Sequence, residues 1–260
     1  MTPPITASWT LSLAALLMLS GSRAHAQDRI EASVGFWHPR ADIVVASDGG
    51  GLQGTSINLR QDTGLTDGHF PVVALALRVA ARHKVRFEYL PIAYESSATL
   101  TRDLVFTGVT YPRGAAIGST FDWKSYGAGY EYDFLVKPRW AAGLIVEARQ
   151  TDIQERLSSA SATQARRTRV PVPVVGGTVR VDPAEHFSMS VELTGFKVPN
   201  SADRHYGGHY ADLKVLGTIH VTSHIGAQAG YRLVDIGHLG ESDSATLTLR
   251  GVYFGAVVSR

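Results

Sequence analysis

Two carboxylate–imidazole pairs in the sequence have the residue types of an acid–base site. Asp67 and His69 are separated by one residue, and so are Asp203 and His205. A carboxylate next to an imidazole can orient the ring as a general base. The chain has ten histidines, however, and two such pairs are close to what chance would produce. We therefore expect both pairs to be solvated loop residues.

Two further pairs could support nucleophilic or metal chemistry. His186 and Ser188, separated by one residue, have the types of a base and a nucleophile. His205 and His209 are four residues apart, with two aspartates nearby, and could hold a surface metal ion. That spacing aligns ligands on a helix but not on a strand or loop. We expect a solvated, aromatic-rich loop here.

The remaining signatures of catalysis are missing from the sequence. There are no cysteines, which excludes thiol nucleophiles and cysteine-based zinc sites. There is no Gly-x-Ser-x-Gly, no His-Glu-x-x-His and no phosphate-binding loop. The net charge of +2 gives no reason to expect a nucleic-acid partner. The sequence therefore predicts no catalytic residue, no metal and no cofactor, and a protein that is not an enzyme.

The elements that must position these residues are β-strands. The stretch 83–90, HKVRFEYL, alternates charged and apolar residues, so its two faces differ. Similar alternation recurs in segments longer than the 5–6 residues of typical strands and close to the 9–11 that cross a bilayer. We predict strands at 29–46, 69–80, 83–95, 119–135, 140–157, 169–181, 186–198, 208–221, 224–237 and 245–258.

The connections between these strands alternate in length. Short turns are expected near 81–83, 137–139, 182–185 and 222–223, and longer polar loops near 47–68, 96–118, 158–168, 200–207 and 239–244. Short turns on one side and long loops on the other are typical of outer-membrane barrels. The predicted fold is an all-β, up-and-down antiparallel transmembrane β-barrel with ten strands, eight or twelve being the alternatives.

The N-terminus has the pattern of a secretory signal peptide. An apolar run of nine residues at 11–19 is followed by Ala24-His25-Ala26, a small-x-small cleavage site. The run is too short to cross a bilayer as a helix. We predict a signal peptide at 1–26, cleaved after Ala26, and a single barrel domain at 27–260.

The charged faces of the strands are expected to line the barrel lumen. A charge facing lipid costs roughly 2–4 kcal/mol at the midplane, whereas mixed charges inside can pair. The predicted lumen set is Arg78, Lys84, Arg86, Glu88, Glu131, Asp133, Glu147, Arg149, Glu192, Asp212, Lys214, Arg232 and Arg250.

Aromatic residues near the strand ends favour a membrane barrel over its rival, a secreted soluble barrel with an apolar interior. Two aromatic girdles are expected at the membrane interfaces. Phe134, Trp140 and Phe187 are assigned to the girdle near the short turns, and Tyr94, Phe121, Trp123, Phe196, Tyr206 and Tyr210 to the one near the long loops.

The chain resembles the small bacterial outer-membrane β-barrel proteins, the OmpA-like and porin-like superfamily. The resemblance covers 28–260 and rests on the signal peptide, the hairpin rhythm and the segments YGAGYEYDFL (126–135), AQAGYRLVDI (227–236) and LRGVYFGAVVSR (249–260). It implies a bacterial outer-membrane location, contact with outer-membrane lipid and lipopolysaccharide, and insertion by the assembly machinery. The last strand in that group usually ends in an aromatic residue, whereas this chain ends in Val-Val-Ser-Arg.

Catalytic members of the wider group offer two comparisons. Omptin proteases, which are also ten-stranded, set an Asp-x-His pair opposite two acids at the extracellular rim, and this sequence has no Asp-x-Asp partner there. Lipid A deacylases use His-x-Ser in the outer leaflet, whereas His186 and Ser188 are expected at a periplasmic turn. Arg166, Arg167 and Arg169 form a basic cluster that could contact lipopolysaccharide phosphates or simply be a solvated loop end.

The expected function is that of a closed barrel with a structural or surface-interaction role through its extracellular loops. Barrels of about eight strands are filled by side chains, and 16–18 strands leave a channel, so ten strands favour a filled lumen. A narrow pore for ions or small solutes is the alternative. An outer-membrane enzyme of protease or lipid-modifying type is a further one. The extracellular ligand is not identified by the sequence.

Overall fold

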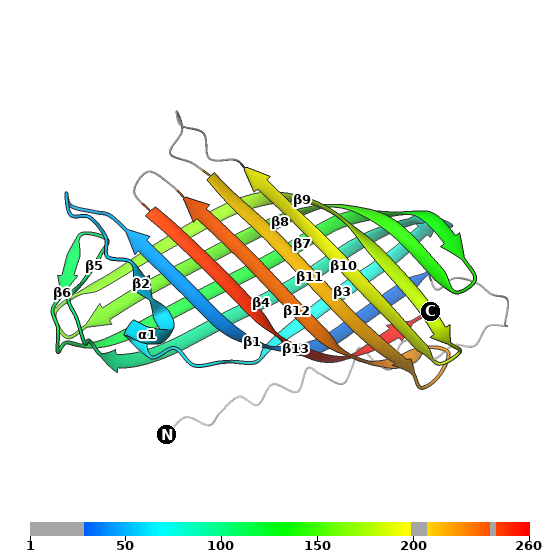
Figure 1. The fold of residues 1–260 in the computed structure, drawn as a ribbon, viewed down its shortest axis with the longest axis horizontal. Coiled ribbons are helices and arrows are strands. Elements are labelled where there is room, and N and C mark those ends of the chain that lie inside the picture. Colours follow the sequence, from blue (N-terminus) through cyan, green and yellow to red (C-terminus); the bar gives the residue numbers. More distant parts are fainter. Residues whose placement is uncertain (1–28, 199–206, 240–242) are drawn as a thin grey trace, which may run out of the picture.

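Ten long strands form an antiparallel β-barrel in the computed structural model, which describes residues 29–198, 207–239 and 243–260 (Figure 1). The predicted signal peptide at 1–26 lies outside the described residues. The barrel strands are β1 (Ile30–Ser47), β3 (Phe70–Ala80), β4 (His83–Thr99), β7 (Ala116–Lys137), β8 (Trp140–Ser159), β9 (Thr163–Ala184), β10 (Phe187–Val198), β11 (Gly207–His220), β12 (Ile225–Leu239) and β13 (Asp243–Ser259).

Each barrel strand pairs with the next in chain order, and the last pairs with the first. The closing ladder between β1 and β13 runs from Glu31 opposite Ser259 to Ser47 opposite Asp243. Closure leaves no free sheet edge, which is the condition for spanning a bilayer with strands. The predicted ten-stranded, up-and-down antiparallel barrel is confirmed.

Four short elements lie within the connections at one end. They are β2 (Ile57–Asn58), α1 (Leu59–Thr63), β5 (Leu104–Phe106) and β6 (Val109–Tyr111). Figure 1 shows them at the left end of the barrel, with the C-terminus near the right end. Because outer-membrane barrels have short periplasmic turns and longer extracellular loops, we assign the end with these elements as extracellular. In the described residues, no helix has the length and apolarity needed to cross a membrane.

One predicted long loop is a strand extension instead. β8 continues to Ser159 and β9 begins at Thr163, so three residues join them where a loop over 158–168 was expected. The paired residues there, such as Gln154 opposite Arg167, are polar on the outer face. The alternation of apolar and polar residues therefore could not predict this part of the hairpin. Backbone hydrogen bonds between β8 and β9 hold it together.

Alternation along each strand separates a buried face from an apolar outer wall. On β8, Ile145 is 1% exposed while its neighbour Leu144 is 56% exposed. Phe87 on β4 also faces outward, whereas Lys84 and Arg86 point into the barrel. Exposed large apolar side chains occur all round the barrel, on β1, β3, β4 and β7 to β13. An outer surface of this kind requires a lipid solvent.

The apolar wall has a uniform height. On β7 the first outward polar side chain, Lys124, comes ten residues from Phe134, and on β12 Asp235 comes ten from Ile225. Ten residues rising about 3.4 Å each at a tilt near 40° span about 26 Å, close to the apolar band of outer-membrane barrels. The outer polar ring, as we name this level, comprises Arg40, His69, Glu95, Lys124, Gln150, Arg169, Lys197, His209, Asp235 and Arg250.

The predicted extracellular aromatic girdle is wrong. Tyr94, Phe121, Trp123 and Tyr210 are buried inside the barrel. Tyr94 is an even number of residues from Lys84, so the pleat puts both on the inner face. Phe196 lies at the rim, and Tyr206 is outside the described residues. At the periplasmic end the prediction fits better, because Phe134 and Trp140 are exposed on the outer wall.

Candidate functional site

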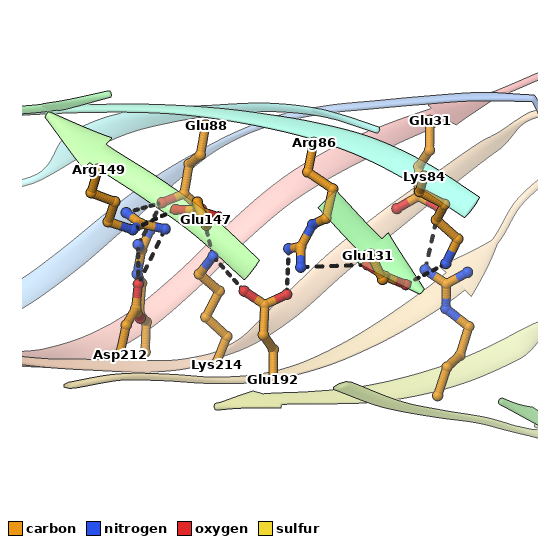
Figure 2. A network of polar contacts seen from close by, with 12 residues as sticks. Glu31, Lys84, Arg86, Glu88, Glu131, Glu147, Arg149, Glu192, Asp212 and Lys214 are labelled. Atoms are coloured by element: carbon orange, nitrogen blue, oxygen red, sulfur yellow. Dashed lines mark hydrogen bonds and ion pairs between the residues drawn. The ribbon is translucent and has the colours of Figure 1, made fainter. Parts of the chain in front are cut away.

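A network of ion pairs fills the periplasmic part of the lumen, and Figure 2 shows much of it. The structure places every predicted lumen residue in it except Arg250. Six members are basic and six acidic, so the network is neutral. Its members are Arg78, Lys84, Arg86, Arg149, Lys214 and Arg232 with Glu88, Glu131, Asp133, Glu147, Glu192 and Asp212.

The network begins near the periplasmic end with Lys84 on β4. Its Nζ lies 2.5 Å from Oε1 of Glu131 and 3.2 Å from Oδ2 of Asp133, both on β7. Arg78 on β3 also donates to Oδ2 of Asp133, at 3.2 Å. The pleat places alternate residues of paired strands on one face, which brings these four charges together. Each carboxylate here is shared between neighbouring strands.

The middle of the network crosses the lumen. Arg86 on β4 lies 3.4 Å from Glu131 and donates to Glu192 on β10. Lys214 on β11 bonds Glu192 at 3.1 Å and Glu88 on β4 at 2.6 Å. Figure 2 shows Lys214 and Glu192 reaching from one wall toward Glu88 and Arg86 on the other. These contacts join opposite walls of the barrel across its interior.

Near the extracellular end of the network, Glu88 is the acid that bonds the most cations. It accepts from Arg149 on β8 at 2.9 Å and from Arg232 on β12 at 2.6 Å. Arg232 also forms a bidentate pair with Asp212, at 3.1 and 2.6 Å. Arg149 lies 2.7 Å from Glu147. A planar guanidinium can serve several carboxylates in this way, which a lysine cannot.

Burial of these charges explains why each of them lies next to an opposite charge. Arg149 is 1% exposed, and Asp212 and Arg232 are similarly inaccessible. An unpaired charge at such a site would be strongly destabilising, whereas a matched set is tolerated. Every acid in the network lies within ion-pair distance of at least one cation.

Aromatic rings cover the upper surface of the network. The Arg232 guanidinium lies 5.4 Å from the centroid of Trp37, and that of Arg149 lies 5.5 Å from the centroid of Tyr210. Cation–π contacts of this kind strengthen when water is excluded. The network is therefore bounded on its extracellular side by an aromatic layer.

Above the aromatic layer, the inner face becomes apolar. Leu90, Ile92 and Trp123 are buried here, on the same strands that carry charges lower down. The connections fold over this layer and add their own apolar side chains, including Leu59 on α1 and Phe106 on β5. The extracellular part of the lumen is therefore a hydrophobic core, which the predicted set of charged lumen residues does not include.

Two long connections, residues 48–69 and 100–115, cover the hydrophobic core and together form the loop cap. Hydrogen bonds between them hold the cap in place. Thr55 and Val105 bond each other twice, through Thr55 N to the Val105 carbonyl and Val105 N to Thr55 Oγ1, both at 2.9 Å. Thr107 N donates to the carbonyl of Ser47 at 3.1 Å. The Tyr111 hydroxyl donates to the carbonyl of Leu157 on β8 at 3.1 Å. The cap is thus tied both to itself and to the barrel wall.

A salt bridge joins the two loops at the surface of the cap. Arg102 forms a bidentate pair with Asp62 on α1, at 2.9 and 2.7 Å. The hydrogen bond from Arg102 holds the pKa of Asp62 below its ordinary value. Asp62 also accepts from the backbone of Asn58, which caps α1. Ionised Asp62 therefore stabilises the closed arrangement.

The prediction that Arg250 lines the lumen is wrong. Arg250 is exposed on the outer wall, while Leu249 and Tyr253 on the same strand are buried inside. At this height the lumen is apolar, so the apolar face of β13 points inward and the polar face outward. Arg250 lies directly opposite Arg40 on β1.

The two carboxylate–imidazole pairs do not form an active site in the described residues. Asp67 forms a salt bridge with Arg60. His69 stacks on His38, with ring centroids 5.8 Å apart. Asp203 and His205 lie outside the described residues. The expectation of solvated loop residues is consistent with Asp67, which is more than half exposed.

The other sequence candidates are also separated. Ser188 bonds His220 at 3.1 Å rather than His186. His209 lies on the outer wall and bonds Asp235 at 2.8 Å, whereas Asp212 lies inside with Arg232. Among the described residues, no group of three or more potential ligands could hold a metal ion.

The basic cluster at the start of β9 is largely neutralised. Arg167 bonds Asp152 at 2.8 and 2.6 Å, and Arg169 bonds the same carboxylate at 3.0 Å. Both arginines are about half exposed on the outer wall of the hairpin. Their charge is therefore already partly balanced within the protein.

Comparison with solved structures identifies relatives in fold. The outer-membrane protease OmpT from Escherichia coli aligns over 92% of this chain and 99% of its own, with a TM-score of 0.58 and 9% identity. Ail, the attachment invasion locus protein of Yersinia pestis, aligns over 87% and 99%, with a TM-score of 0.36 and 10% identity. No family model and no curated protein sequence matches the chain.

The similarity to OmpT establishes a shared fold and does not transfer an activity. It agrees with what the coordinates show independently, a closed ten-stranded barrel with an apolar wall about one bilayer core in height. The chain therefore has the fold of a bacterial outer-membrane β-barrel protein, with an apolar outer wall of the height that such barrels place in lipid.

Proposed function

We propose that the protein is a closed outer-membrane barrel that acts through its extracellular surface rather than by conducting solutes. The observation that carries this proposal is the double closure of the lumen. The ion-pair network blocks the periplasmic part, and the hydrophobic core and loop cap block the extracellular part. A permeating ion would have to break buried ion pairs and then cross a dry apolar layer.

The shape of the extracellular end supports a surface role. On β7 the strand continues eight residues beyond Lys124 to Ala116, a rise of about 20 Å above the outer polar ring. β8 and β9 extend with it, and β1 and β13 also continue beyond the ring, past Arg40 and Arg250. The result is a raised wall of strands around the loop cap, suited to presenting side chains to a partner outside the cell.

Conductance in planar lipid bilayers tests the closed lumen. Purified barrel should insert and show no stable current steps under an applied voltage. A matched variant lacking residues 100–115, which carry the β5–β6 hairpin, should also remain closed because the ion-pair network is intact. Stable open steps in the unmodified protein would instead support a narrow pore.

The fold shared with OmpT does not favour proteolysis in this chain. OmpT is a protease. In the part of this chain that the structure describes, the sequence candidates for such chemistry are engaged elsewhere or point apart. Incubation with casein and basic peptides should give no cleavage beyond that of a boiled sample, and sustained cleavage would replace our proposal with an enzymatic one.

A further inference from the structure

Two arginines face each other on the outer wall at the seam that closes the barrel. Arg40 on β1 and Arg250 on β13 are direct cross-strand partners and both are exposed. Directly opposite residues of an antiparallel pair have their Cβ atoms about 5 Å apart. Arg250 lies nine residues from Ser259, which places it about 23 Å above the periplasmic end of the strand. The pair therefore sits at the outer edge of the apolar wall.

In the part of the chain that the structure describes, neither arginine has an anionic partner. Among the described residues, Arg40 and Arg250 make no ion pair, in contrast to Arg167 and Arg169, which share Asp152. The nearest outward acids have other partners. Asp42 accepts from Asn58 at 3.3 Å, and Asp235 is held by His209 and Thr248.

Such a pair is unfavourable without a counterion. Like charges directly opposite each other destabilise a sheet. Two adjacent guanidinium groups also provide the planar, multidentate donors that bind phosphate oxygens best. An external anion at this position would satisfy both arginines at once.

Aromatic and apolar side chains form a surface directly below the pair. His38 stacks on His69, and Phe254 contacts His38 edge-on with centroids 6.4 Å apart. Val252 and Phe36, also exposed, continue this surface down the wall toward the periplasmic side. A molecule bound here would have an anionic head at the arginines and room for hydrocarbon chains along the strands.

We propose that Arg40 and Arg250 bind the phosphate of a lipid in the outer leaflet, whose acyl chains lie along β1 and β13. The site lies at the headgroup level and faces away from the lumen, so it is independent of whether the barrel conducts. It also differs from the basic cluster at the start of β9, where Asp152 already occupies the arginines.

Binding of lipid A to the full barrel in uncharged detergent micelles tests the site. The probes are bisphosphorylated lipid A and the same lipid after enzymatic removal of its phosphates. The unmodified protein should bind the phosphorylated form at least about tenfold more tightly, as expected for charge-assisted bonds to two arginines. The double variant R40Q/R250Q should lose this preference.

The matched control is R167Q/R169Q, which removes the same charge at a similar height on the opposite side of the barrel. It should change the affinity for lipid A by less than about twofold, because Asp152 already pairs with both arginines. Retained heat-modifiable migration on gels shows that each variant is folded.

Three outcomes would overturn the proposal. Equal binding of phosphorylated and dephosphorylated lipid A would exclude phosphate recognition. An equal loss in both double variants would indicate general charge attraction. Competition by millimolar inorganic phosphate, lost in R40Q/R250Q, would identify a soluble anion as the ligand instead of a lipid.

Discussion

Glu88 on β4 and Lys214 on β11 meet across the lumen at 2.6 Å, although their strands are five apart in either direction around the barrel. A single ion pair thus spans the full width of the interior. The same carboxylate also bonds Arg149 and Arg232. Glu88 is therefore the acid on which closure of the network most depends.

Removing the charge of Glu88 should be strongly destabilising. Glu88→Gln leaves three buried cations with one acid fewer, and breaking a buried pair typically costs about 3–5 kcal/mol. The free energy of unfolding in urea, measured in phospholipid vesicles, should fall by about that amount. Glu95→Gln on the outer polar ring is the matched control and should stay within about 0.5 kcal/mol. Similar losses in both variants would contradict the network's role.

The orientation of β4 can be tested by placing a charge at two depths on its outer face. Phe87→Arg puts an arginine near the middle of the apolar wall and should destabilise the inserted barrel by roughly 2–4 kcal/mol. Ala93→Arg lies one outward position below Glu95, near the interface, and should cost about 0–1 kcal/mol. The yield of heat-modifiable barrel in outer-membrane fractions measures the difference. Equal yields would argue against this orientation.

The sequence was sufficient to predict the barrel and the residues of its periplasmic lumen, because one rule holds in that part of the molecule. Between the short turns and the outer polar ring, the outer wall of the barrel faces lipid instead of water. Charges such as Arg86 and Glu131 must therefore point inward. Alternation then determines the face of every other residue on those strands.

The same rule fails above the ring. There the outer wall meets water and the lumen is closed by a hydrophobic core, so polarity inverts along a single strand. Arg250 and Tyr94 were misassigned for this reason. Parity could have placed Tyr94, since it shares a face with Lys84. The cap is different, because Leu59 and Phe106 come from separate loops and no local pattern predicts their contact with the core.

Acid should loosen the loop cap. The pKa of Asp62 is lowered by its hydrogen bond with Arg102, so the folded cap favours the ionised carboxylate. This stabilisation is complete above the ordinary aspartate pKa of about 3.9 and is lost as the pH falls through the lowered value. Amide exchange at Val105, corrected for the intrinsic effect of pH, should accelerate below about pH 4.

Two variants distinguish this salt bridge from general acid loosening. Asp62→Asn should show faster exchange at Val105 already at pH 6, with little further change in acid. Asp103→Asn removes a different cap carboxylate, one that accepts from the Arg113 amide, and should keep the acid-dependent step. An unchanged acid step in Asp62→Asn would assign it to another group.

Room for the ion-pair network depends on a glycine on β7. A Cβ at Gly127 would lie 2.5 Å from Oε1 of Glu147, the carboxylate that pairs with Arg149. Gly127→Ala should therefore displace Glu147 and weaken the barrel by about 1–3 kcal/mol, as overpacking usually does. Gly217→Ala on the outer face of β11 is the control, since its nearest neighbour would be Phe187 at 3.4 Å, and it should change the unfolding free energy by less than about 0.5 kcal/mol. If Gly127→Ala unfolds at the same urea concentration as the control, Glu147 can move without loss and the lumen is less tightly packed than its ion pairs indicate.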